Sequence, residues 1–571
     1  MNLNLQAQKD NSYDAIVIGS GISGGWAAKE LTEKGLKTIV LERGRNVEHV
    51  KDYPTMNSQP WDLPINDKIP AKEMKHYQKQ MRAGYTIRES TKHWWVKDDE
   101  HPYTEVKRFD WMRGYHVGGR SIMWGRQSYR WSEMDFESNA RDGVGVDWPI
   151  RYQDLAKWYD YVETFAGISG SKENMEQLPD GKFLPPMELN CVEQHTREQL
   201  EKKFKHRRLI IGRTAHLTAP LPNSNRGTCQ HRNLCMRGCP YGGYFSSNAA
   251  TLPAAAKTGN LTLRPNSVVT EVLYDKDKKR ATGVRILDPT TKETMEFYAK
   301  IIFLNASTIA SAQILMQSAT DVWEGGLGSS SGELGHNVMD HHFLVGAMGE
   351  FEGYGDRYYK GMRPNGIFIP RFQNLPNHKD TKKDYLRGYG FQGGSSRTNW
   401  TRLVKELTIG QPLKELVQTP GPWSMGMSAF GECLPYHENK ITLNREVLDV
   451  NGQPTLTFDV SFKENEQQMR KEAMVVAAET LEAAGFTKVF PFDMGSFPGL
   501  GIHEMGTARM GKDPKTSVLN KWNQVWDAKN VFVTDGACMT SSASQNPSLT
   551  YMALTARAAD YAVSELKKQN L

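Results

Sequence analysis

The chain has 571 residues, of which 39% are hydrophobic and 24% are charged, and its formal net charge is +6. This length exceeds one typical hydrophobic core, so we expect two domains or one domain with large insertions. The small net charge gives no reason to expect a nucleic-acid partner. The sequence has no apolar run long enough to predict a transmembrane segment.

The N-terminal segment Tyr13–Gly44 has the pattern of a dinucleotide-binding unit. An apolar run ends in Gly19, Gly21 and Gly24, spaced as G-x-G-x-x-G, and a helical pattern then leads to a second apolar run that ends at Glu42. The three glycines allow a tight turn, close approach of the backbone to a pyrophosphate and close helix packing. The acidic side chain of Glu42 favours FAD or NAD over NADP. The alternative, a glycine-rich turn in an ordinary α/β protein, does not account for the complete strand-helix-strand context.

Further along the chain, several patterns predict regular elements. Residues 114–130 are rich in glycine, as expected where backbone lies against a flat cofactor. Residues 152–168 and 465–486 have helical periodicity. The runs LTLRPNSVVTEVLYD and ATGVRILD predict a strand pair with KDKK as the turn, and IIFLNAS predicts a strand that enters the helix TIASAQILMQSA. The alternating stretches WSMGMSAFGECLP, KITLN and TLTFDVSF predict an antiparallel sheet.

Five separated segments together resemble the glucose-methanol-choline (GMC) family of FAD-dependent oxidoreductases. They are GSGISGG with Glu42, GGRSIMWG at 118–125, LGHNVMDHH at 334–342, HEMGTARMG at 503–511, and VTDGACMTSSASQNPSLTYMALTARAA at 533–559. With the cysteine segment described below, the chain is most similar to the large catalytic subunits of bacterial glucoside 3-dehydrogenases and gluconate 2-dehydrogenases. The resemblance implies a Rossmann-type α/β FAD-binding domain with an inserted α+β substrate domain that contains a mostly antiparallel sheet.

The resemblance also implies domain boundaries. We expect residues 1–50, 105–135, 225–345 and 490–571 to form a discontinuous FAD-binding domain. Residues 51–104, 136–224 and 346–489 would form the substrate-binding domain and lid segments.

The resemblance assigns the site residues as well. Oxidation of an alcohol needs a base for the hydroxyl proton and an acceptor for the hydride, here the flavin. The resemblance makes His503 the base and places Asn546 beside it, hydrogen-bonded to the same hydroxyl. An isolated histidine would more often be structural, but this one lies in a glycine-rich motif and is matched by an Asn-Pro pair. The expected cofactor-binding residues are Gly19, Gly21, Gly24, Glu42, Arg43, Gly118, Gly119, Ser121, Trp124, Gly125, Val269, Asp535, Gly536 and Pro547.

One position differs from relatives that attach FAD covalently. Those relatives have a histidine two residues after the serine of the GG-x-S segment, where this chain has Met123. We therefore expect FAD to be bound non-covalently. His116 is near in sequence but lies in the wrong register for this attachment.

Three cysteines are clustered. Cys229, Cys235 and Cys239 are spaced C-x5-C-x3-C and followed by a proline, a pattern typical of metal sites or of a disulfide. Three thiolates suit a [3Fe-4S] cluster, and the resemblance to sugar dehydrogenase subunits favours this reading. A structural zinc bound with His231 is the second interpretation, and one disulfide with a free thiol is the third.

The resemblance implies an FAD-dependent dehydrogenase that oxidises a secondary alcohol of a sugar or glycoside, with the C3 hydroxyl favoured. Electrons would pass through the iron-sulfur cluster to a cytochrome c-type or other non-oxygen acceptor, and a small subunit is an expected partner. An oxygen-using alcohol or sugar oxidase and a non-catalytic FAD-binding subunit of a redox complex are the alternatives. The N-terminus lacks the apolar core of a signal peptide, so we expect either a cytoplasmic protein or export to the bacterial periplasm with a partner subunit.

Overall fold

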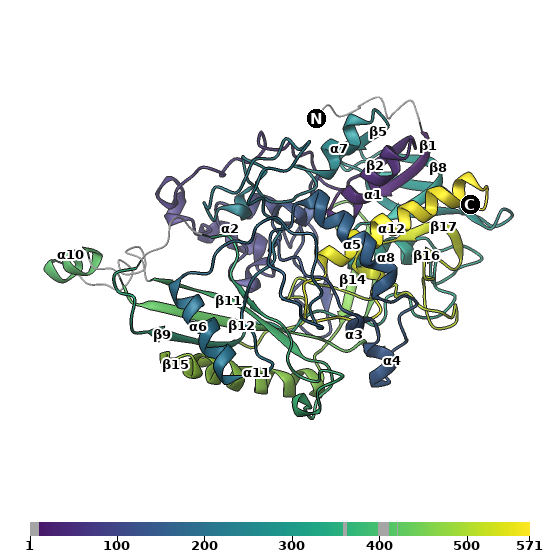
Figure 1. The fold of residues 1–571 in the computed structure, drawn as a ribbon. Coiled ribbons are helices and arrows are strands. Elements are labelled where there is room, and N and C mark those ends of the chain that lie inside the picture. The colour runs from purple at the N-terminus through teal and green to yellow at the C-terminus, as the bar shows by residue number, and fades with distance from the viewer. Residues whose placement is uncertain (1–10, 358–362, 398–409, 419–420) are drawn as a thin grey trace.

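The computed structural model describes residues 11–357, 363–397, 410–418 and 421–571. Its first sheet has eight strands, in the order β16-β17-β8-β1-β2-β5, and the β6–β7 hairpin joins it through β7 (Figure 1). The pairs β1-β2, β1-β8, β2-β5 and β17-β8 are parallel. The strands are β1 (Ser12–Ile18), β2 (Thr38–Leu41), β5 (Leu261–Arg264), β6 (Val268–Asp275), β7 (Arg280–Leu287), β8 (Thr294–Leu304), β16 (Gln524–Val525) and β17 (Ala528–Val533).

This sheet is buried on both faces because its central strands are apolar at consecutive positions. On β1, Ile16 and Ile18 join one core cluster, whereas Ala15 and Val17 join another. Successive side chains of a strand point to opposite faces, so the sheet separates the two clusters. The second cluster includes apolar residues of α1 (Ile22–Glu33), α7 (Thr251–Lys257) and α12 (Ser548–Lys567), and the first includes residues of the β6–β7 hairpin and α8 (Thr308–Gln317). The predicted β6–β7 hairpin and the predicted entry of β8 into α8 are confirmed.

A second sheet has six antiparallel strands in the order β15-β9-β12-β11-β10-β4 and lies at the lower left of Figure 1. Helix α11 (Glu464–Ala483) packs on β9, β12 and β15 and also contacts α6 (Cys191–Lys203). Both helices share a core cluster with this sheet. The strands are β4 (Ile210–Ile211), β9 (Val345–Phe351), β10 (Ile367–Ile369), β11 (Tyr389–Arg397), β12 (Trp423–Gly431) and β15 (Thr487–Asp493).

The expectation that three alternating stretches share one sheet is wrong in part. The first stretch forms β12 of the six-stranded sheet. The other two form β13 (Lys440–Leu448) and β14 (Pro454–Asp459), which pair with each other and with β3 (Thr104–Glu105) in a separate three-stranded sheet. Alternation sets which side chains are buried but not which strands become neighbours.

The two periodic segments form the predicted helices, α5 (Tyr152–Ala166) and α11. In the described ranges the other α-helices are α2 (Ala71–Met74), α3 (Glu133–Phe136), α4 (Ser138–Asp142) and α10 (Gln411–Gln418). The domain boundaries stay a prediction. Within segment 51–104, Tyr53, Trp94 and Trp95 are buried in the same core cluster as β1 residues, so this segment packs on the nucleotide-binding unit.

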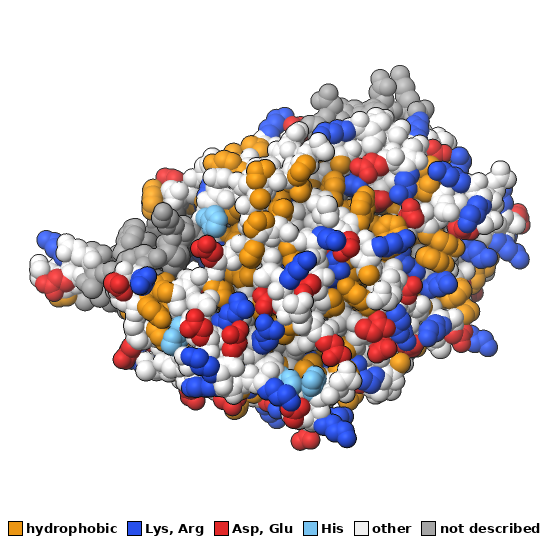
Figure 2. Space-filling view, in the orientation of Figure 1, with side chains coloured by type: hydrophobic (Ala, Val, Ile, Leu, Met, Phe, Trp, Pro, Cys, Tyr) orange, Lys and Arg blue, Asp and Glu red, His pale blue; other side chains and the backbone are white. Residues whose placement is uncertain are grey.

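The surface mixes both signs of charge. On the face shown in Figure 2, Lys and Arg side chains are interspersed with Asp and Glu rather than gathered in one region. Among the described helices, none combines the length and apolar composition needed to cross a bilayer.

Candidate active site

The glycine turn after β1 has the geometry of a dinucleotide-binding loop. Gly19 has φ +93°, and a Cβ there would lie 2.5 Å from the carbonyl oxygen of Asn305. A Cβ on Gly24 would lie 2.0 Å from the oxygen of Gly19, so helix and turn pack too closely for any side chain. At Gly21 a Cβ would meet nothing within 4 Å, which leaves open space beside the start of α1. This geometry leaves room for a pyrophosphate to lie against the backbone at the N-terminus of α1.

Glu42, at the end of β2, is fixed beside this turn. One carboxylate oxygen accepts from the Ser20 backbone N–H at 3.1 Å and from its hydroxyl at 2.6 Å. The other accepts from the Gly44 N–H at 2.9 Å. Burial raises the pKa of Glu42. A carboxylate has about four acceptor positions, so capacity remains for a ribose hydroxyl.

A single cavity of about 430 Å³ extends from this turn to the catalytic candidates. Of the predicted cofactor-binding residues, Gly24 and Gly118 do not line it. Gly24 is held against Gly19, and Gly118 has φ +89° with Asn248 where a Cβ would be. The other predicted residues line the cavity together: Gly19, Gly21, Glu42, Arg43, Gly119, Ser121, Trp124, Gly125, Val269, Asp535, Gly536 and Pro547, with His503 and Asn546.

His503 and Asn546 meet at one end of the cavity. Asn546 Nδ2 lies 3.2 Å from His503 Nε2, although the residues are 43 positions apart in the sequence. His503 Nδ1 lies 2.9 Å from Nδ1 of His341, and Gln392 Nε2 donates to Asn546 Oδ1 at 2.6 Å. Burial lowers the pKa of His503 well below its usual value, and the nearby His341 and Arg120 side chains lower it further. A neutral imidazole beside a carboxamide donor can accept a proton from a hydroxyl that binds between them.

Charged groups lie directly behind this pair. The Asp340 carboxylate accepts the backbone N–H groups of Gly499, Gly501 and His503 at 2.8–2.9 Å, which fixes the backbone on which His503 stands. Burial and the nearby Glu504 carboxylate raise the pKa of Asp340 to about 7. Glu504 is paired with Arg120 at 2.8 Å, and both line the cavity.

Asp535, after β17, is also buried, and burial raises its pKa to about 6. Its carboxylate accepts from the N–H groups of Ser307 and Ala537 at 3.0 Å and from the Ser311 hydroxyl at 2.5 Å. It therefore joins the ends of β8 and β17 at the cavity wall.

The loop before Asn546 is tied to several elements at once. Asn139 donates to the Thr540 carbonyl at 3.0 Å, and the Ser542 hydroxyl donates to the Cys433 carbonyl at 2.8 Å. Gln545 donates to Asp135 at 3.2 Å.

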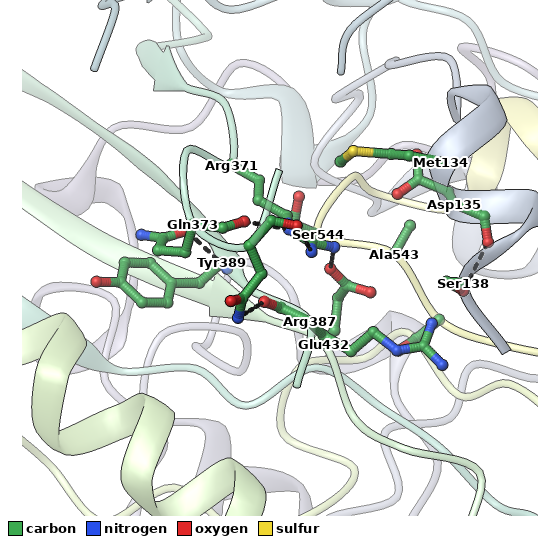
Figure 3. Close-up of polar contacts among 12 residues, drawn as sticks. Met134, Asp135, Ser138, Arg371, Gln373, Arg387, Tyr389, Glu432, Ala543 and Ser544 are labelled. Carbon is green, nitrogen blue, oxygen red and sulfur yellow. Dashed lines mark hydrogen bonds and ion pairs between the residues drawn. The ribbon is translucent and has the colours of Figure 1, made fainter. Parts of the chain in front are cut away.

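Figure 3 shows Ala543 and Ser544 of this loop near buried polar side chains of α3 and of the segments at the ends of β10, β11 and β12. Arg371 pairs with Glu432 at 2.7 Å, and Arg387 donates to Asn139 at 2.7 Å. Because the loop is hydrogen-bonded to α3, α4 and the segment after β12, the position of Asn546 depends on how these elements pack.

Sequence reasoning missed four residues of this site: Asp340, His341, Gln392 and Arg120. Asp340 and His341 lie in the quoted DHH run, and Arg120 lies in the quoted GGRS run. These motifs were recognised, but no function was assigned to the three residues. Gln392 lies in an irregular region with no motif.

Met123 lines the cavity, whereas His116 is buried and is not among the residues that line it. The non-covalent attachment of FAD stays a prediction.

The three clustered cysteines line a second, smaller cavity. Cys235 Sγ lies 3.6 Å from His216 Nε2, and Cys239 Sγ accepts from the Gly243 N–H at 3.4 Å. Burial raises the pKa of Cys229 to about 11 and also raises that of Cys235. All six cysteines lie in the described part of the chain and are free, so the disulfide interpretation is not met.

The zinc interpretation stays a prediction. His216, not the expected His231, lines the cysteine cavity. Within the described ranges, the group of three or more potential ligands whose atoms all lie within 4.8 Å of one another is His206, His378 and Asp380, at the surface, where Lys205 already pairs with Asp380. The three cysteines are not such a group in the described structure.

Comparison with known proteins identifies the class. Models of the GMC oxidoreductase family match residues 13–343 and 435–555, so the chain belongs to this family. Its members act on CH–OH groups, and membership implies FAD, for which the glycine turn and cavity described above are suited.

Relatives that match along nearly their whole length include dehydrogenases of alcohols and sugars as well as oxidases. The chain is 27% identical to a 2-methyl-1,2-propanediol dehydrogenase of Mycolicibacterium austroafricanum over 96% of its length and 94% of the relative's. It is 26% identical to the fructose dehydrogenase large subunit of Gluconobacter japonicus, covering 98% and 99%. It is 25% identical to the gluconate 2-dehydrogenase flavoprotein of Pantoea cypripedii, covering 96% and 93%. The crystal structure of pyridoxine 4-oxidase from Mesorbium loti has the same fold, with a TM-score of 0.57 and 14% identity over 96% of this chain and 98% of that one.

Proposed function

We propose that the protein is an FAD-dependent dehydrogenase that oxidises a secondary alcohol of a sugar or glycoside to a keto sugar, with the C3 hydroxyl as the favoured position. The observation that carries this proposal is the convergence of His503 Nε2 and Asn546 Nδ2 in the cavity that begins at the Gly21 turn. The choice of C3 rests on the resemblance of the sequence to glucoside 3-dehydrogenases.

In this mechanism the two side chains share the substrate hydroxyl. Asn546 Nδ2–H donates to the hydroxyl oxygen, and His503 Nε2 takes the hydroxyl proton as the carbinol carbon loses its hydride. Bound FAD supplies the hydride acceptor. Because Asp340 holds the His503 backbone and Gln392 holds the Asn546 amide, both groups are in place before the substrate arrives.

The lining of the cavity supports a sugar-like substrate. Trp95, Trp111, Trp124 and Tyr115 contribute aromatic rings, and Thr86, Gln127 and Gln392 contribute polar groups. Flat rings with a few polar groups suit the apolar faces and hydroxyl edges of a pyranose.

We further propose that Cys229, Cys235 and Cys239 hold a [3Fe-4S] cluster through which electrons leave. That all three cysteines line one small cavity supports this. Held by these cysteines, such a centre would supply one-electron transfer to a cytochrome c-type or other non-oxygen acceptor. A small subunit is a proposed partner, in line with the relative that is named as a large subunit. If that subunit carries the export signal, the complex is periplasmic.

The test is a dye-reduction screen of purified protein over sugars and glycosides, with products identified by NMR, in wild type and His503→Ala. We expect keto-sugar formation in wild type and loss of flavin reduction in the variant. Unchanged flavin reduction in His503→Ala would overturn the catalytic assignment, and absence of reduction by any polyol in wild type would favour a non-catalytic subunit. Peroxide formed without added dye would favour an oxidase. For the cluster, flavin bands alone in the visible spectrum with no iron by elemental analysis would refute the proposal.

A further inference from the structure

The donor and acceptor roles in the side-chain hydrogen bonds of His503 follow from one carbonyl group. The Ala543 oxygen can only accept, so His341 Nε2, which contacts it, must carry a proton. His341 is fully buried, and burial lowers its pKa to about 4, so the ring is neutral at neutral pH. A neutral imidazole with a proton on Nε2 offers Nδ1 as an acceptor. His503 Nδ1, 2.9 Å away, must therefore be the donor.

The same reasoning continues through the catalytic pair. His503 is neutral as well, so with its proton on Nδ1 its Nε2 carries a lone pair. The atom that faces this lone pair at 3.2 Å is the Asn546 amide nitrogen, a donor. Asn546 Oδ1 then accepts from Gln392 Nε2 at 2.6 Å. This bond fixes the orientation of the Asn546 amide, with its oxygen toward Gln392 and its nitrogen toward His503. Five groups thus form one consistent chain from the Ala543 carbonyl to Gln392.

We propose that His341 is a positioning residue that holds His503 as the Nδ1–H tautomer, so that the Nε2 lone pair faces the substrate hydroxyl. This inference rests on the proposed function of His503 as the base. In the other tautomer His503 would present an N–H to the hydroxyl and could not take its proton. Once His503 has taken the proton, it keeps a charge-assisted hydrogen bond to His341 Nδ1, which stabilises the imidazolium.

A matched pair of substitutions separates the two hydrogen bonds of His341. In His341→Asn the Oδ1 atom replaces Nδ1 as the acceptor for His503, and the bond to the Ala543 carbonyl is lost. In His341→Gln the terminal amide replaces Nε2 as the donor to Ala543, and no acceptor remains beside His503. We expect the rate of flavin reduction by substrate in the holoenzyme to stay within about 10-fold of wild type in His341→Asn and to fall about 100-fold or more in His341→Gln. FAD content and melting temperature should be similar in the two variants.

Equal rates of flavin reduction in His341→Asn and His341→Gln would overturn the proposal, because a merely structural histidine would not distinguish them. His503→Ala is measured alongside. If it reduces flavin normally, the proposed function fails; if it is inactive while both His341 variants match wild type, only the positioning role fails. For the case in which neither variant folds, ¹⁵N-histidine NMR of the wild-type holoenzyme reads the tautomers directly. We expect Nε2–H for His341 and Nδ1–H for His503, and Nε2–H for His503 would contradict the inference.

Discussion

Gln392 donates from Nε2 to the side-chain oxygen of Asn546 across 2.6 Å, and this bond joins strand β11 of the six-stranded sheet to the loop that precedes α12. The residue proposed to orient the substrate hydroxyl is thus itself oriented by the other sheet. Gln392 also lines the cavity. A substitution at this position therefore alters both the shape of the substrate cavity and the orientation of the Asn546 amide.

Replacement of Gln392 by leucine keeps the volume but removes the donor. The Asn546 amide then loses the partner that fixes its orientation, and we expect kcat to fall about 10-fold, the cost of roughly one hydrogen bond, with FAD content unchanged. Steady-state kinetics with the sugar identified by the screen gives the value. Ser396→Ala, an exposed position on the same strand, is the control. A Gln392→Leu enzyme with wild-type kcat would show that Asn546 keeps its orientation without this bond.

The glycines of the turn predict opposite outcomes for one added methyl group. At Gly21 the methyl enters open space beside the cavity, so Gly21→Ala should fold normally but bind FAD at least about 10-fold more weakly. At Gly24 the methyl would meet the Gly19 oxygen at 2.0 Å, so Gly24→Ala should lower the free energy of unfolding of the apoprotein by about 1–3 kcal/mol or more. Flavin fluorescence titration and chemical denaturation of apoprotein measure the two effects. Equal stability of both variants would contradict this account.

The nucleotide-binding half of the site could be predicted from local sequence because its geometry is local. Gly19, Gly21 and Glu42 act through one strand-helix-strand unit, and their spacing alone specifies where each must lie. His503 and Asn546 came from family resemblance, since no spacing rule relates residues that are far apart in the chain.

The supporting residues could not be predicted in the same way. Gln392 and His341 reach the catalytic pair from β11 and from the segment before β9, and only the packed structure brings these segments together. The separation of β13 and β14 from the six-stranded sheet has the same cause, because strand neighbours are chosen by tertiary packing and not by alternation. Gly118 was expected at the cofactor, but in the structure it adopts a positive φ in a turn that packs closely against the Asn248 side chain.

The pH dependence of substrate oxidation follows from the low pKa of His503. Since the base must be neutral to accept a proton, and burial holds its pKa well below 6.5, the rate of flavin reduction should not decline as the pH falls from 8 to about 6.5 on account of this group. Loss of activity from protonation of His503 begins only at lower pH. Asp340, whose pKa is raised to about 7, can add an inflection near neutrality, and Asp340→Asn should remove it. Stopped-flow reduction across this range is the measurement. An acid limb at or above pH 6.5 that persists in Asp340→Asn would contradict the assignment.

The cysteine loop places adjacent residues in different cavities, because Cys235 lines the cysteine cavity while Met236 lines the cofactor cavity. A redox centre bound at Cys235 would therefore lie next to the flavin space, and its loss should affect the exit of electrons but not their arrival. We expect Cys235→Ser to lose iron and to reduce a one-electron protein acceptor at least about 10-fold more slowly, with flavin reduction by sugar within about 2-fold of wild type. Cys191→Ser, a free cysteine outside this cavity, serves as the control. Parallel loss of both half-reactions would show that the loop acts on the fold of the flavin site, and retention of both would show that electrons leave by another route.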